Sequence, residues 1–101
     1  MLRIVKLTFE EDKVDDFLKF FNTINTKVAG FEGCNGMKLL QDIHSSNVVF
    51  TYSDWSSEEA LNNYRYSELF KGVWSTIKPW FAKKAEAWSV DTYFNGFPNQ
   101  E

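Results

Sequence analysis

The sequence predicts an α+β fold of the ferredoxin-like class, with strands and helices in the order β-α-β-β-α-β. Two observations support this prediction. Apolar residues recur at helical spacing in two separate segments, and β-branched and aromatic residues concentrate in the segments around them. This order gives a four-stranded antiparallel sheet that carries both helices on one face and leaves the other face bare.

The first strand and the first helix are predicted from the start of the chain. Apolar and polar residues partly alternate in Leu2–Phe9, as is typical of a strand. Apolar residues then repeat at steps of three and four between Val14 and Val28, which predicts an amphipathic helix. Asp12 is the expected N-cap, and Gly30 is expected to stop the helix.

The central hairpin is predicted from two strand-like segments and the polar turn between them. Met37–Ile43 is expected to form the second strand, and Val48–Trp55 is expected to form the third. The polar residues 44–47 are expected to make the turn. His44, the only histidine, is therefore expected in solvent.

A second helix and a last strand are predicted from the rest of the chain. A capping box is expected at the helix start, with the Ser56 hydroxyl bound to the amide of Glu59. We expect Ser67 to restart this helix after a bend and Pro79 to break it near its end. Lys84–Phe94 is the predicted last strand.

Length and composition indicate one small domain. The 101 residues suffice for a single core, which we assign to residues 1–95, with 96–101 as a C-terminal tail. The net charge of -3 excludes a typical nucleic-acid binder, which needs a basic surface. One cysteine, Cys34, excludes an internal disulfide, and no apolar run resembles a signal peptide or a membrane span. We therefore expect a cytoplasmic protein.

The third predicted strand has bulky residues on both faces. Phe50 and Tyr52 share one face, whereas Thr51, Ser53 and Trp55 share the other. Aromatic residues make up 18% of the chain, more than a small monomer readily buries. We therefore expect a homodimer in which two sheets pack face to face.

The segment from Trp55 to Phe81 resembles the antibiotic biosynthesis monooxygenase superfamily, the dimeric α+β barrel proteins. Members typically have a tryptophan that ends the third strand, a capped helix, an aromatic residue or histidine, and a Ser-x-x-Phe step. The matching residues here are Trp55-Ser56-Ser57-Glu58-Glu59-Ala60-Leu61, Tyr64 and Ser67-Glu68-Leu69-Phe70.

One branch of this superfamily degrades haem, and the resemblance does not extend to its ligands. Those members use an asparagine on the first strand and a histidine late in the second helix. The corresponding positions here fall on Leu7 and Trp74, and neither side chain can ligate iron as an imidazole does. We therefore expect neither haem nor another metal or cofactor.

The other branch oxidises phenolic or quinonoid molecules without a metal or flavin. The resemblance to it implies that Trp55 and Tyr64 are catalytic, through an indole N–H and a hydroxyl that stabilise a developing oxyanion. Some members have a histidine in place of Tyr64, so the identity of a base stays open. The expected ligand-binding residues are Leu7, Thr51, Ser53, Ser67, Phe70 and Trp74.

Each of these residues also has a purely structural interpretation. Trp55 is equally expected as a rim aromatic, whereas Tyr64, Phe70 and Trp74 are more typical of a packed helix than of a ligand site. Arg65 is either a surface charge, which the sequence favours, or a contact to a substrate anion. Two functions follow: a cofactor-independent monooxygenase of a small aromatic, or a non-catalytic dimeric module that binds a small apolar ligand. An open cavity bounded by Trp55 and Tyr64 would favour the first.

Overall fold

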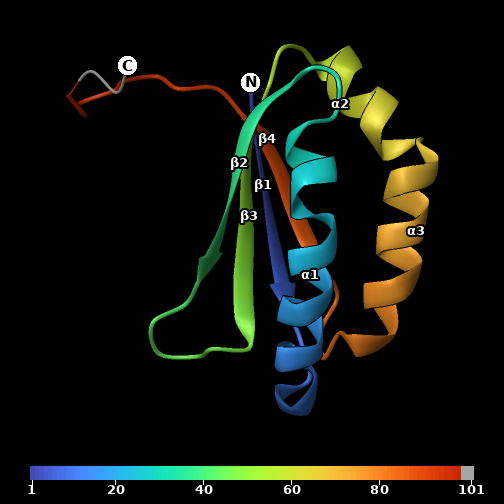
Figure 1. Ribbon diagram of the computed structural model, residues 1–101. Helices are drawn as coiled ribbons and strands as arrows, with labels where there is room; N and C mark the ends of the chain where they lie inside the picture. Colours follow the sequence, from blue (N-terminus) through green and yellow to red (C-terminus); the bar gives the residue numbers. More distant parts are fainter. Residues whose placement is uncertain (99–101) are drawn as a thin grey trace.

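Four strands form one antiparallel sheet, in the spatial order β2-β3-β1-β4, in a computed structural model that describes residues 1–98 (Figure 1). Three helices cover one face of this sheet and no helix covers the other, which confirms the predicted ferredoxin-like arrangement. The elements are β1 (Leu2–Thr8), α1 (Val14–Ala29), β2 (Cys34–Gln41), β3 (Val48–Trp55), α2 (Glu58–Arg65), α3 (Glu68–Ile77) and β4 (Glu86–Val90), with short 3-10 helices η1 (Glu11–Lys13) and η2 (Lys78–Trp80).

The core lies between the sheet and the helices, toward the end of the sheet where β1 finishes. Phe9 is fully buried and stacks on Phe17 of α1, with 4.4 Å between the ring centroids. Leu7 and Val49 pair across β1 and β3, and Ile77 of α3 closes the cluster. Burial of these apolar side chains supplies most of the driving force for folding.

The predicted bend in the second helix is confirmed and divides it into α2 and α3. The Ser67 hydroxyl accepts a hydrogen bond from the Phe70 amide at 3.1 Å, so Ser67 is the N-cap of α3. The cap of α2 is Ser57, which accepts from the Ala60 amide, so the capping box expected at Ser56 is wrong by one residue. The Ser56 amide instead donates to a carbonyl at the start of β2, which delays the turn into the helix.

The N-cap expected at Asp12 is also wrong. Asp12 lies inside η1, and α1 starts at Val14 after Lys13, whose side chain makes no capping hydrogen bond. The carboxylates of the first turn, on Asp15 and Asp16, still interact favourably with the positive end of the helix dipole.

The bounds of β2 and β4 differ from the predicted ones by more than one residue. The glycine-rich segment before Met37 is typical of a loop in the sequence. A bulge between Cys34 and Gly36 lets it pair with β3 nevertheless, so β2 begins at Cys34. Gly36 has φ 144°, which glycine adopts easily. β4 ends at Val90 because its partner strand β1 begins at Leu2, which pairs with Val90.

Gly33 fixes how closely α2 approaches the start of β2. Its φ is 89°, and a Cβ atom at this position would lie 2.5 Å from the Cβ of Ala60. Its carbonyl accepts a hydrogen bond from the Ser56 amide at 2.8 Å. Only glycine combines this backbone conformation with such a close helix, so Gly33 helps to place α2 over the sheet.

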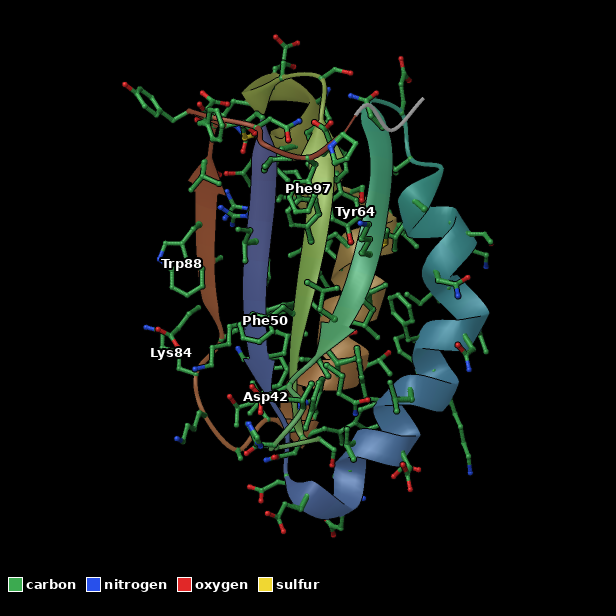
Figure 2. All side chains as sticks on the ribbon, turned by 90° about the vertical axis from the view of Figure 1, so that its left-hand side faces the viewer. Asp42, Phe50, Tyr64, Lys84, Trp88 and Phe97 are labelled. Atoms are coloured by element: carbon green, nitrogen blue, oxygen red, sulfur yellow. The ribbon has the colours of Figure 1, made fainter. Side chains whose placement is uncertain are left out.

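The bare face of the sheet is partly apolar. Phe50 and Trp88 lie on the face turned away from the helices, whereas Tyr64 lies behind the sheet (Figure 2). Trp88 is 45% exposed, and Lys6 and Glu86 form an ion pair at 4.0 Å on the same face. The predicted tail, 96–101, lies partly outside the described residues, at 99–101.

Within residues 1–98, no helix is both long enough and apolar enough to cross a lipid bilayer.

Candidate functional site

A cavity of about 360 Å³ lies between the helix-covered face of the sheet and the helices α2 and α3. A ligand pocket for a small molecule is typically of this size or larger. An adjoining apolar space of about 90 Å³ continues toward α1. The residues that line the larger cavity are Arg3, Val5, Val28, Met37, Thr51, Ser53, Trp55, Leu61, Tyr64, Arg65, Phe70, Trp74, Ala85 and Ala87.

Trp55 forms one end of this cavity and is 2% exposed. The alternation of β3 points its ring toward the helices, where it stacks on Tyr64 with 5.2 Å between the ring centroids. Its indole N–H donates to the Ser53 hydroxyl at 2.9 Å. A direct hydrogen bond from Trp55 to a substrate therefore requires Ser53 to give up this bond.

A continuous row of aromatic rings forms the helical wall of the cavity. Tyr64 of α2 packs edge to face against Phe70 of α3, with 5.2 Å between the ring centroids, and Phe70 stacks on Trp74 with 5.6 Å between theirs. The ring centroids of Trp74 and Phe81 are 5.4 Å apart. Because Ser67 bends the chain between the helices, residues from both helices contribute to one wall.

Tyr64 is a neutral hydrogen-bond donor at physiological pH. Burial in the apolar site and, to a lesser extent, the neighbouring Cys34 raise the pKa of Tyr64 from 10.0 to about 12. Its hydroxyl therefore stays protonated and is a poor general base. No side chain among residues 1–98 forms a hydrogen bond with this hydroxyl.

The structure brings most of the predicted site residues to one cavity. Trp55, Tyr64, Thr51, Ser53, Phe70 and Trp74 all line it. Leu7 lines only the adjoining apolar space, and it is also part of the core. Ser67 lines neither space, because its hydroxyl donates to the Tyr64 carbonyl at 2.6 Å and caps α3.

Two basic residues, Arg3 and Arg65, also line the cavity. The sequence does not predict Arg3 as a site residue, and it favours a surface position for Arg65. Arg3 shares the helix-covered face of β1 with Val5 and Leu7, so strand alternation was the signal that could have found it. Arg65 ends α2 and lines the cavity while remaining exposed. Burial and then the positive charge of Arg65 lower the pKa of Arg3.

The remaining polar candidates, His44 and Cys34, do not line the cavity. His44 is exposed in the turn between β2 and β3, as predicted, where its amide donates to the carboxylate of Asp42. The Cys34 thiol donates to the Gly36 carbonyl at 3.6 Å. In the part of the chain described by the structure, no three histidine, cysteine or acidic side chains gather as a metal site would require.

A sequence model of the family described as antibiotic biosynthesis monooxygenase matches residues 1–73. Among curated proteins, none matches the chain.

Several solved structures share the fold at low sequence identity. A putative antibiotic biosynthesis monooxygenase from Nitrosomonas europaea is 13% identical, with a TM-score of 0.84 over 92% of this chain and 98% of that one. One from Caulobacter crescentus is 21% identical, with a TM-score of 0.83 over 92% and 89%. A conserved protein from Methanosarcina mazei is 21% identical, with a TM-score of 0.78 over 85% and 86%.

Proposed function

Because the chain belongs to the antibiotic biosynthesis monooxygenase family, we propose that it is a cofactor-independent monooxygenase of a small aromatic, phenolic or quinone-like molecule. The observation that supports this most directly is the open cavity bounded by Trp55 and Tyr64. A filled core at this place would have favoured a purely structural domain. The aromatic wall and the few polar groups match what a flat apolar substrate requires.

In the proposed reaction the substrate supplies the electrons. A deprotonated anthrone, for example, reacts with dioxygen at its methylene carbon, which becomes a carbonyl while the second oxygen atom leaves as water. The protein contributes an apolar cavity that excludes water and donors that stabilise the negative charge on oxygen. The protonated hydroxyl of Tyr64 is suited to this role, and the indole of Trp55 is a second donor once it is released from Ser53.

One observation favours the second candidate, a non-catalytic module that binds a small apolar ligand. Among the described residues that line the cavity there is no histidine, carboxylate or lysine. Tyr64 is protonated, so no lining side chain serves as an ordinary general base near neutral pH.

Oxygen uptake distinguishes the two functions. We expect the protein to accelerate oxygen consumption by 1,8-dihydroxyanthrone or naphthalene-1,4-diol above the rate in buffer. Ala87 pairs with Val5 and lines the cavity, so Ala87→Trp is expected to fill it and to lower this rate about tenfold or more. Ala82→Trp adds the same side chain at an exposed position outside the cavity and is expected to retain the rate. Uptake equal to the buffer rate with both substrates contradicts an oxygenase.

We also propose that two copies associate through the bare faces of their sheets. Leu40 pairs with Phe50, and Val90 shares the face of Trp88 in β4, so all of them lie on this face. Leu40, Trp88 and Val90 are 45%, 45% and 39% exposed. Pairing of two such faces is expected to bury roughly 2,000 Å² or more in total.

Light scattering at micromolar concentration is expected to give the mass of two chains. Phe50→Asp places a charge in the centre of this face and is expected to yield monomers. Tyr66→Asp, at a position 76% exposed after α2, is the control that leaves the mass unchanged. A monomeric mass for the unmodified protein contradicts this proposal.

A further inference from the structure

We propose that Arg3 and Arg65 form an anion-binding pair in the cavity, which selects an aromatic ligand with one acidic group and holds that group ionised. This inference rests on the proposed use of the cavity as a ligand site, and it adds the charge of the ligand. The pair is called the arginine pair below.

The chain places both of its arginines in one cavity. Arg3 and Arg65 are the only arginines among the 11 basic residues of the sequence, and the other nine are lysines. The two side chains come from different elements, β1 and the C-terminal end of α2, and both line the space beside Trp55 and Tyr64. No lysine lies among the described residues of the lining. Arginine is the residue best suited to recognise a planar anion, because its guanidinium forms two parallel hydrogen bonds.

The arginine pair has no acidic partner within residues 1–98. The ion pairs of this region involve the N-terminus and lysines, and none includes an arginine. Arg3 donates one hydrogen bond from Nη1 to the Ser89 hydroxyl at 3.0 Å. The other guanidinium N–H groups of Arg3 and all those of the Arg65 guanidinium make no hydrogen bond within the same residues.

The positive charges of Arg3 and Arg65 repel one another. Burial and the positive charge of Arg65 both lower the pKa of Arg3, yet a guanidinium stays protonated in proteins. Two like charges therefore share a partly buried site with no carboxylate in its lining. A bound anion would remove this repulsion and would satisfy the free N–H groups.

The ligand chemistry follows from this arrangement. The rings of Phe70 and Trp74 offer apolar surface for an aromatic body, while the arginine pair offers donors for a carboxylate or phenolate. Two nearby positive charges lower the pKa of a bound acid. The arginine pair would thus produce the phenolate that the proposed oxidation needs, although no ordinary base lines the cavity.

Calorimetric titration with 2-naphthoate and 2-naphthamide tests the pair. The probes share one aromatic body and differ in charge, so we expect the protein to bind naphthoate about tenfold or more tightly than naphthamide. Arg65→Gln is expected to remove most of this preference, and Arg65→Lys to keep part of it. Lys19→Gln, which removes an exposed charge from α1 outside the cavity, is expected to leave the preference unchanged.

The outcomes separate this inference from the proposed oxygenase. Three results would overturn the arginine pair. The protein could bind both probes equally, or it could bind neither. The naphthoate preference could also persist in the Arg3→Gln/Arg65→Gln double variant. A clear naphthoate preference that the arginine variants remove supports the pair, even where oxygen uptake stays at the buffer rate and the oxygenase fails. Circular dichroism of each variant checks that loss of the Arg3–Ser89 bond between β1 and β4 has not unfolded the sheet.

Discussion

Replacing Trp55 with alanine is expected to lower the free energy of unfolding by about 3–5 kcal/mol. The side chain is 2% exposed and stacks on Tyr64, and its ring centroid lies 6.5 Å from that of Phe31. Its loss would enlarge a cavity that is already present, so neighbouring groups cannot easily fill the space. Urea denaturation followed by circular dichroism measures the change.

Trp55→Phe is the matched control for this prediction. Phenylalanine keeps most of the apolar surface and removes the N–H that donates to Ser53 at 2.9 Å. The Ser53 hydroxyl still donates to the Arg3 carbonyl, so the expected loss is about 1 kcal/mol. An alanine variant as stable as the phenylalanine variant would show that Trp55 is a rim residue with little part in packing. On a confirmed substrate, Trp55→Phe is also expected to lower turnover about tenfold through loss of an oxyanion donor.

Above about pH 10, the protein is expected to lose stability because of Tyr64. The pKa of this residue is about 12 in the folded protein and 10.0 ordinarily, so between these values the folded state binds the additional proton. Stability is therefore fully present below pH 10 and falls as the pH rises toward 12. The loss is expected to reach about 1 kcal/mol by pH 11 and roughly 2–3 kcal/mol when the transition is complete.

Comparison of the protein with Tyr64→Phe isolates this contribution. The variant lacks the ionisable group, so the difference in urea midpoint between pH 9 and pH 11 is expected to be smaller in the variant. Absorbance of tyrosinate should also show a step near pH 12 that Tyr64→Phe removes. Tyr93→Phe, at a fully exposed position, should keep that step. A Tyr64→Phe variant with the same pH dependence as the original protein would contradict the raised pKa.

The two sets of variants also separate the roles of the cavity residues. Trp55 is expected to act mainly on stability, because its polar atom is already bound within the protein. Tyr64 offers a hydroxyl with no hydrogen-bond partner in residues 1–98, and the arginine pair offers positive charge. If the protein oxidises a phenolic substrate, variants of the Tyr64 hydroxyl and of the arginine pair should therefore change turnover most.

Local sequence determined the order of the elements and much of their extent. Val48–Trp55 forms β3 as predicted, because a run of β-branched and aromatic residues ends at a serine pair that starts a helix. The same alternation predicts Thr51, Ser53 and Trp55 on one face, and all three line the cavity. Ser67 was correctly expected to restart the helix, since a serine before Glu68 is a strong local signal.

Tertiary structure decided which residue caps α2, where β4 ends and which charges line the cavity. Ser56 and Ser57 are equally good caps in the sequence, and the hydrogen bond from the Ser56 amide to Gly33 made Ser57 the cap. Strand β4 ends at Val90 because Val90 pairs with Leu2, the first residue of its partner strand β1. Arg3 and Arg65 lie far apart in the chain, and only the packing of α2 against β3, beside β1 in the sheet, brings both charges to one cavity. Helix and strand periodicity are local and can be read along the chain, whereas hydrogen-bond competition and charge proximity depend on which distant residues fold together.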